Sequence, residues 1–322
     1  MKFRTEIELA KWQRPIEYHH RIVSLGSCFA NNIAGLLAEH KFNITASPTG
    51  ILFNPLSIAS AVELMTANKS IDSESLIELN GRYVAYDFHS SISGNSREEA
   101  TANMQRALEI GGEALRSADH IIITLGTAWV YRLAESGKVV ANCHKQPASL
   151  FRRELLRVEE ICEALQSIIL STSADITFTV SPVRHIGEGI EDNSLSKALL
   201  RVAIATIVEH YPQRAKYFPS YEILIDDLRD YRFYGDDLVH PSTAAIAYIG
   251  EKFFEAAISD CAKQKIARIE KIVEAANHRP HNPRSEQYHN FCRTQLAAIA
   301  ELDGVDLEKE KGFFERMLQI NL

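Results

Sequence analysis

Residues 22–30 read IVSLGSCFA, an apolar run that ends in Gly-Ser and passes directly into a segment of helical character. After the turn, apolar residues recur at helical spacing: Phe29, Ile33, Leu36 and Leu37. The pattern predicts a strand, a sharp turn at Ser27 and a helix that reaches about residue 40. A serine there lies at a helix N-terminus, where backbone N–H groups stabilise negative charge, so Ser27 is a candidate nucleophile. The structural alternative is that Ser27 caps the helix and Gly26 makes the turn.

A second informative stretch, YGDDLVHPS, covers residues 234–242. Asp237 and His240 stand three residues apart in it, just before a predicted helix. His240 is therefore a candidate base for Ser27, and Asp237 is a candidate to orient the imidazole. The structural alternative is a solvated acidic turn followed by a helix cap at Ser242.

Residues 26–30 spell GSCFA, and on this motif the chain resembles the GSCFA family, whose members are similar to SGNH/GDSL-type hydrolases. Those enzymes carry a nucleophilic serine in a first block near the N-terminus and an Asp-x-x-His block near the C-terminus. The resemblance runs from about residue 20 to 255. It implies catalytic roles for Ser27, Asp237 and His240.

The fold class follows from alternating strand and helix patterns. Apolar runs rich in Ile, Val, Thr and Phe predict buried parallel strands at residues 21–25, 120–125, 175–180 and, more weakly, 216–218. Helical patterns lie between and after them, at residues 55–68, 96–117, 152–171, 194–210 and 243–257. We therefore expect a three-layer α/β/α sandwich with a mostly parallel central sheet, as in SGNH hydrolases and flavodoxin-like folds. The expected domains are 1–259 and a helical C-terminal extension, 260–322, packed on it.

In such sheets, ligands bind beyond the carboxyl ends of the strands. Polar motifs follow each of the first three predicted strands: Gly26-Ser27, then Gly126-Thr127, then Ser181 to His185. We expect Gly126, Thr127, Arg184 and His185 to border the site. Arg184 and His185 either form part of the pocket, with the arginine binding an anion, or belong to a loop held by hydrogen bonds.

The oxyanion site is where the chain departs from the wider pattern. The resemblance implies a glycine in the second block that donates to the oxyanion, and Gly50 is the candidate. The alternative is that Gly50 only makes a turn. SGNH enzymes have Gly-x-Asn-Asp in the third block, whereas residues 126–129 here read GTAW, so the usual Asn amide is missing. Asn54 and Asn142 are candidate substitutes. For Asn54 the alternative is a helix cap, since Pro55 suits the first helical position.

The loop at residues 142–147, NCHKQP, concentrates reactive side chains. His144 or Lys145 is a candidate contact for an anionic or carbonyl group. Cys143 as a thiolate nucleophile and a purely structural loop are the alternatives.

Two metal readings are weaker. One would join Asp236, Asp237 and His240 to His185 or His144, and the other would use the zinc-like spacing in the tail. The tail residues concerned are His278, His281, His289 and Cys292. We expect no metal and no organic cofactor.

Composition bounds the partners. The formal net charge of -7 and the pI near 6.0 argue against nucleic acid or an anionic membrane as the main partner. No apolar run approaches the ~20 residues of a membrane span, and the start of the chain lacks the apolar core of a secretory signal. The 5 cysteines, an odd number, suggest reduced thiols. A cytoplasmic location is expected, and the sequence indicates no oligomeric state.

The sequence thus predicts a serine esterase or acyl hydrolase that works through an acyl-enzyme, with a small-molecule or glycan ester as substrate. Phe53, Trp129 and Tyr131 are candidates to stack on a sugar or to line an acyl pocket. An acyltransferase using the same residues, a catalytically silent binding module of the same fold and a metal-dependent hydrolase are the alternatives.

Overall fold

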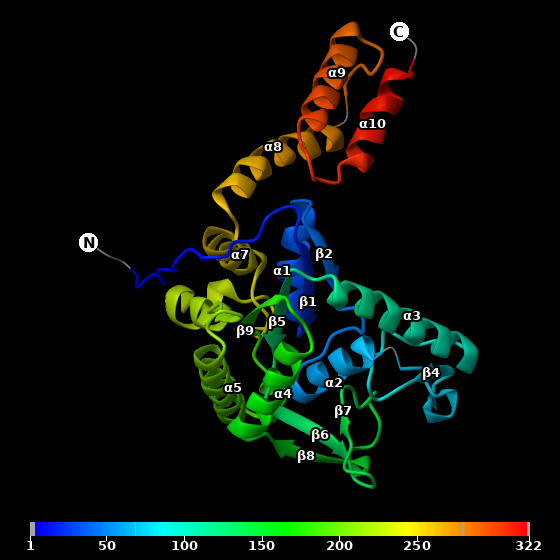
Figure 1. The fold of residues 1–322 in the computed structure, drawn as a ribbon, viewed down its shortest axis with the longest axis vertical. Helices are drawn as coiled ribbons and strands as arrows, with labels where there is room; N and C mark the ends of the chain where they lie inside the picture. Colours follow the sequence, from blue (N-terminus) through cyan, green and yellow to red (C-terminus); the bar gives the residue numbers. More distant parts are fainter. Residues whose placement is uncertain (1–3, 68, 279, 321–322) are drawn as a thin grey trace. The chain divides into compact units, whose positions relative to one another are not determined.

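A computed structural model describes residues 4–67, 69–278 and 280–320 of the chain. Its centre is a five-stranded sheet in the order β10-β9-β5-β1-β2 (Figure 1). The strands are β1 (Arg21–Gly26), β2 (Asn43–Ala46), β5 (His120–Leu125), β9 (Asp175–Val180) and β10 (Ala215–Tyr217). The pairs β1–β5, β5–β9 and β9–β10 are parallel. The four predicted parallel strands are confirmed.

The register of these strands brings their carboxyl ends to one edge. Gly26 of β1 lies opposite Thr124 of β5, and Leu125 of β5 lies opposite Val180 of β9. The loops that follow the three strands therefore start side by side, as the distribution of polar motifs predicts.

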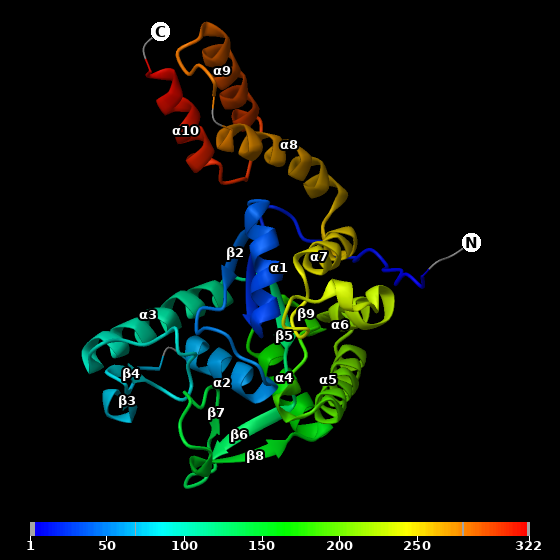
Figure 2. The ribbon, with the colours of Figure 1, turned by 180° about the vertical axis from the view of Figure 1, so that it is seen from behind.

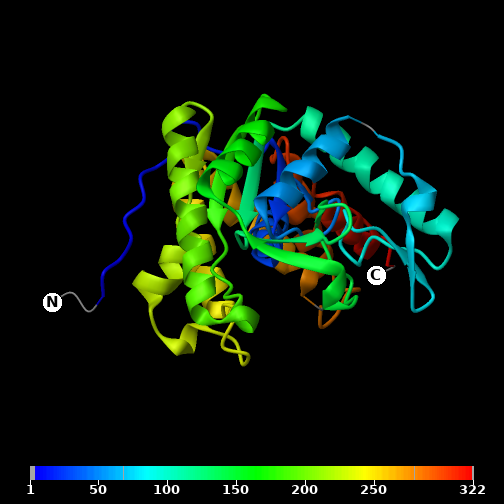
Figure 3. The ribbon, with the colours of Figure 1, turned by 90° about the horizontal axis from the view of Figure 1, so that it is seen from below.

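Helices cover both faces of the sheet. α3 (Arg97–Arg116), α2 (Pro55–Thr66), α4 (Val158–Leu170) and α5 (Ile190–His210) follow one another side by side in one layer (Figure 3). The strand order reverses at β1, so right-handed crossovers place α1 (Cys28–Glu39) on the opposite face, where α7 (Thr243–Ala257) also lies (Figure 2). The chain is an α/β sandwich with a mostly parallel central sheet.

A second, antiparallel sheet corrects one prediction. It has the order β7-β6-β8, with β6 (Trp129–Leu133), β7 (Val139–Val140) and β8 (Phe151–Leu155). β8 takes the first residues of the helix expected from residue 152, because it pairs with β6 while its three central residues face solvent. The helix begins at Val158, where the Glu160 carboxylate accepts the Arg157 N–H.

Smaller elements complete the fold. A hairpin joins β3 (Ile77–Leu79) to β4 (Arg82–Val84), and a short helix, α6 (Ser220–Glu222), runs into a π-helical turn at Ile223–Leu228. Short 3-10 turns lie at Ser73–Ser75, Ala148–Leu150, Ile186–Glu188 and Tyr231–Phe233.

The chain divides into two compact units. The first holds the central sheet and comprises Met1–Glu8, Arg21–Ala34 and Ile44–Phe253. The second comprises Leu9–His20, Gly35–Asn43 and Phe254–Leu322, and it contains α8 (Asp260–Asn277), α9 (Glu286–Ala300) and α10 (Glu308–Leu318). It therefore takes in two segments from before the predicted boundary at residue 259.

Local contacts explain why those early segments belong to the second unit. Ile16 forms a parallel bridge with Ile258, and the Trp12 N–H donates to the Ala256 carbonyl at 2.9 Å. The ring of Tyr18 stacks on Phe42 with centroids 4.3 Å apart. Backbone pairing holds the first early segment to residues 256–258, directly before α8, and ring stacking holds it to the second.

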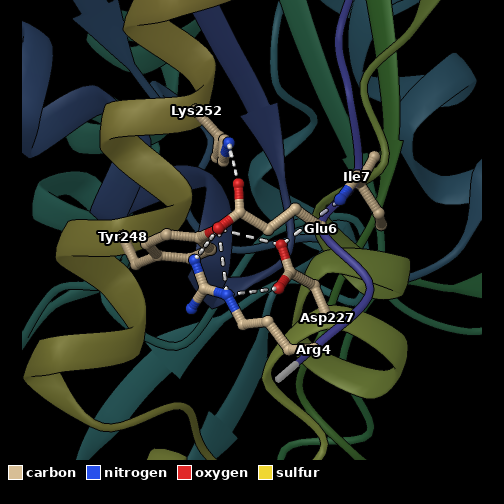
Figure 4. Close-up of polar contacts among 6 residues, drawn as sticks. All are labelled: Arg4, Glu6, Ile7, Asp227, Tyr248 and Lys252. Carbon is tan, nitrogen blue, oxygen red and sulfur yellow. Dashed lines mark hydrogen bonds and ion pairs between the residues drawn. The ribbon is translucent and has the colours of Figure 1, made fainter. Parts of the chain in front are cut away.

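The first unit ties its N-terminal segment down through a buried carboxylate (Figure 4). The Asp227 side chain is fully buried, and its Oδ2 accepts the Tyr248 hydroxyl at 2.9 Å and the Ile7 N–H at 3.4 Å. Arg4 Nε lies 3.6 Å from Oδ1 of the same carboxylate. The Asp227 carboxylate of the π-helical turn thus contacts both the N-terminal segment and α7.

Among the described residues, no helix combines the length and the apolar character that crossing a membrane requires.

Candidate active site

The turn after β1 requires a glycine. Gly26 has φ +123°, and a side chain there would collide with the Thr124 carbonyl of the neighbouring strand. The following N–H, that of Ser27, donates to the same carbonyl at 2.9 Å. This close approach fixes Ser27 at the strand edge, directly before α1.

The Ser27 hydroxyl does not cap the helix that follows it. Ser27 is fully buried, and its Oγ has no hydrogen-bond partner among the described residues. Two other cap candidates behave differently, because Asn54 Oδ1 accepts the Ser57 N–H at 2.8 Å and Ser242 Oγ accepts the Ala245 N–H at 3.3 Å. The structural alternative thus holds for Asn54 and Ser242, and it does not account for Ser27.

Asp237 and His240 contact each other, as the three-residue spacing predicts. His240 Nδ1 lies 2.6 Å from Asp237 Oδ2, and Asp237 Oδ1 accepts the N–H groups of His240 and Val239 at 2.9 and 3.0 Å. These hydrogen bonds lower the pKa of Asp237 to about 2, with the backbone N–H of His240 contributing most. The side chains of Asp237 and His240 are 52% and 54% exposed, so the pair is open to solvent. Between them Leu238 adopts φ +58°, a strained conformation for leucine.

The pair lies beside the loop that follows β9. The Arg184 N–H donates to the Val239 carbonyl at 3.3 Å, and the charge of His240 contributes to lowering the pKa of His185. The structure therefore brings Asp237 and His240 together next to this loop. It forms no hydrogen bond between His240 and the Ser27 hydroxyl.

A buried lysine, which we did not predict, joins the ends of two strands. Lys197 of α5 is 1% exposed, and its Nζ donates to the Gly126 carbonyl at 2.7 Å and to the Ser181 carbonyl at 2.8 Å. Burial lowers its pKa to about 7, and the neighbouring Cys28 counteracts this in part. A sequence signal existed, because Lys197 stands on the buried stripe of α5 with Leu200.

Other side chains of α5 reinforce the same loops. Ser196 Oγ accepts the Ala128 N–H at 2.7 Å and lies 3.1 Å from the Thr127 hydroxyl. Asn193 Oδ1 accepts the His185 N–H at 2.9 Å. The first turns of α5 therefore set the positions of the loops after β5 and β9.

His185 is held neutral at the edge of this region. Burial, the charge of Lys197 and that of His240 together lower its pKa to about 4. Its Nε2 is buried and has no hydrogen-bond partner among the described residues. The imidazole packs edge-on against Phe53, and a methyl group on Gly126 would lie 3.3 Å from Nε2.

The expected oxyanion donors are engaged in internal bonds. The Gly50 N–H donates to the Ser47 carbonyl at 2.8 Å. This position requires a glycine because its φ is +84° and a side chain would collide with His89. The N–H groups of Gly126 and Thr127 both donate to the Phe53 carbonyl, at 2.7 and 3.0 Å.

Comparison with protein families identifies the chain. The model described as "GSCFA family" matches residues 21–253, and that described as "GSCFA domain protein, C-terminal domain" matches residues 269–320. The chain belongs to the GSCFA family. A search of the curated proteins found no match.

In this GSCFA protein the loop at residues 142–147 is tied to residues 85 and 90 by hydrogen bonds. Asn142 donates to Ser90 Oγ at 3.2 Å and accepts the His144 N–H at 2.8 Å. His144 Nε2 lies 2.8 Å from the Ala85 carbonyl, and its Nδ1 lies 3.1 Å from Ser90 Oγ. Burial raises the pKa of Cys143, which disfavours a thiolate there.

The guanidinium of Arg184 lies over the ring of Tyr234, 5.0 Å from its centroid.

A cavity of about 360 Å³ opens beside these loops. It brings together Asn54, Thr127, Asn142 and His185 with the three aromatic candidates, Phe53, Trp129 and Tyr131. Ser27 and His240 are not among the residues that line it.

The described part of this GSCFA chain contains no group of three or more His, Cys, Asp or Glu side chains arranged to hold one metal ion. The metal readings of the Asp236–His240 segment and of the tail therefore have no geometric support.

Proposed function

We propose that this GSCFA protein is a serine esterase or acyl hydrolase of SGNH type, acting on a carboxylic ester through an acyl-enzyme. The observation that carries the proposal is the Ser27 hydroxyl. It is buried, it has no partner among the described residues, and it stands at a strand end beside α1 without capping it. A buried unpaired hydroxyl costs about 1–3 kcal/mol. The hydroxyls of Thr49 and Thr124 are unpaired in the described part of the chain as well, and Ser27 differs from them by its place directly before α1.

The residues have defined roles in the proposed reaction. Ser27 Oγ attacks the ester carbonyl carbon while its proton passes to Nε2 of His240, whose Nδ1 is held by Asp237. The tetrahedral intermediate collapses, and the leaving alcohol takes the proton from His240. Water then attacks the acyl-enzyme, gives a proton to His240 and releases the acid as Ser27 regains its proton. An alcohol in place of water would make the same site an acyltransferase.

Two features supply positive potential for the developing oxyanion. Ser27 precedes the N-terminus of α1. The buried ammonium of Lys197 interacts electrostatically with Cys28, the residue that follows Ser27. The proposed chemistry also requires a movement that brings the half-exposed His240 imidazole to the enclosed hydroxyl. A small-molecule or glycan ester as substrate and a cytoplasmic location are parts of the same proposal.

Hydrolysis of short p-nitrophenyl esters tests the proposal. We expect Ser27→Ala to abolish turnover, because it removes the nucleophile. Ser24→Ala is the matched control, since Ser24 is equally buried in β1 but its hydroxyl already donates to the Ala30 carbonyl at 3.2 Å. Equal activities in the two variants would reject Ser27 as nucleophile.

A second candidate is a catalytically silent binding module. It is favoured by the lack of a hydrogen bond between Ser27 and His240 and by the internal bonds of the Ser27 and Gly50 N–H groups. Such a protein would bind an ester or its product without turnover. No hydrolysis across an ester panel, together with binding that Ser27→Ala leaves unchanged, would establish it in place of the esterase.

A further inference from the structure

The cavity beside the strand ends has a largely apolar wall. It is lined by aromatic and aliphatic side chains from the loop before α2 and from the small antiparallel sheet: Phe53, Trp129, Tyr131, Val140 and Ala141. Its volume of about 360 Å³ falls in the range of small-molecule sites. At about 30 Å³ for each water-sized group, it holds roughly a dozen non-hydrogen atoms.

Three polar side chains of the wall, those of Asn54, Thr127 and Asn142, are already paired, whereas His185 Nε2 has no partner among the described residues. Asn54 donates to Ser57 Oγ at 2.9 Å and accepts the Ser57 N–H at 2.8 Å. Thr127 Oγ1 accepts the Trp129 N–H at 3.0 Å and lies 3.1 Å from Ser196 Oγ. The amide of Asn142 is used in the same way, by Ser90 and by the His144 N–H. A sugar ring needs several donors and acceptors at fixed positions, and these groups would have to break existing bonds to supply them.

The described residues of the wall carry no charge at neutral pH. None is Asp, Glu, Lys or Arg, and His185 is neutral because burial lowers its pKa to about 4. The wall therefore offers no charge to pair with a carboxylate, a phosphate or an ammonium group. Apolar surface is what it does offer.

His185 connects the cavity with the proposed catalytic residues. Its ring lies on the cavity wall against Phe53, and the charge of His240 lowers its pKa. Gly126, whose Cα faces the same imidazole, belongs to the loop that Lys197 holds. The cavity is thus next to the strand ends where the ester is expected to react.

We propose that this cavity receives the acyl chain of the substrate, so that the preferred ester carries a neutral aliphatic acyl group of several carbons rather than a sugar in this position. This inference rests on the proposed esterase function for its kinetic consequence. Its binding consequence stands without that function.

The kinetic test uses p-nitrophenyl acetate, butyrate and hexanoate, which share one leaving group. We expect kcat/KM to rise by roughly fourfold for each methylene buried. Ala141→Phe fills the cavity and should remove this rise. Ala134→Phe is the matched control, because Ala134 is exposed in the turn after β6. A flat chain-length profile in the wild type, or the same profile in both variants, would overturn the proposal.

The binding test separates this inference from the esterase proposal. Trp129 lines the cavity and the chain has 2 tryptophans, so Trp12→Phe leaves Trp129 as the fluorescent reporter. In that background with Ser27→Ala, we expect methyl hexanoate to change the Trp129 emission and methyl glucoside to leave it unchanged. Adding Ala141→Phe should abolish the response. Binding of the glucoside, or no binding of either probe, would contradict the acyl pocket even if ester hydrolysis is found.

Discussion

Asp237 holds His240 through two hydrogen bonds: its Oδ2 lies 2.6 Å from the imidazole Nδ1, and its Oδ1 accepts the His240 N–H at 2.9 Å. The same Oδ1 also accepts the Val239 N–H at 3.0 Å. The carboxylate therefore fixes both the backbone turn and the imidazole of the residue proposed as base. It leaves Nε2 as the nitrogen for proton transfer.

Asp237→Asn should lower kcat/KM by about 10³–10⁴-fold, because an amide favours the wrong tautomer of the imidazole. Asp236→Asn is the control, since Asp236 is the exposed neighbour. Ester hydrolysis by the two variants measures the effect. Similar rates in both would show that Asp237 only shapes the turn.

Lys197→Met should change how stability depends on pH. The pKa of Lys197 is lowered from 10.5 to about 7 on folding, so the unfolded state binds more protons between these values. The penalty for burying the charge is complete below pH 7 and disappears as pH rises to 10.5. The unfolding free energy of the wild type, relative to the variant, should therefore rise by up to about 5 kcal/mol over that window.

Urea unfolding of the wild type and Lys197→Met at pH 7, 8, 9 and 10 checks this expectation. Because the variant also leaves the Gly126 and Ser181 carbonyls unpaired, the absolute difference is not the informative quantity. A difference that stays constant with pH would contradict a lysine that is buried and largely desolvated.

His185 should stay neutral down to about pH 4, since burial, Lys197 and His240 lower its pKa from 6.5. NMR titration of histidine-labelled protein measures this, and His185→Gln assigns the signal among 12 histidines. We expect Lys197→Met to raise the pKa of His185, because it removes a nearby positive charge. The same shift makes the folded state lose stability as pH falls from 6.5 towards 4. Titration near 6.5 would place the imidazole in solvent.

Asp227→Asn should destabilise the first unit by about 2–3 kcal/mol. The substitution removes the charge that faces Arg4 and weakens the bonds from Tyr248 and Ile7 (Figure 4). Asp226→Asn, one residue earlier in the same π-helical turn, is the control. Thermal unfolding of both variants measures the effect, and equal melting temperatures would show that the buried carboxylate contributes nothing.

The central sheet was predictable because its strands are buried on both faces. Apart from Arg21, every residue of β1, β5 and β9 is buried, and the structure places these strands within one residue of the predicted bounds. β8 could not be predicted in the same way, because its residues Phe151–Leu155 include three exposed charged side chains and fit the first turn of a helix equally well. Pairing with β6, a partner about 20 residues away, decides its conformation.

The candidate site was predictable in its members more than in its contacts. The motif identified Ser27, and the three-residue spacing identified Asp237 and His240, whose contact is local. Lys197 was missed because its two acceptors, Gly126 and Ser181, come from loops that only the folded sheet brings together. Whether a serine at a helix start caps that helix also depends on coordinates, as Ser27 and Ser242 show.

Covalent labelling with a fluorophosphonate probe, followed by peptide mass spectrometry, tests the central proposal most directly. We expect one adduct, on Ser27, that is absent in Ser27→Ala and strongly reduced in His240→Ala. Labelling that persists unchanged in Ser27→Ala, or an adduct on another residue, would contradict it.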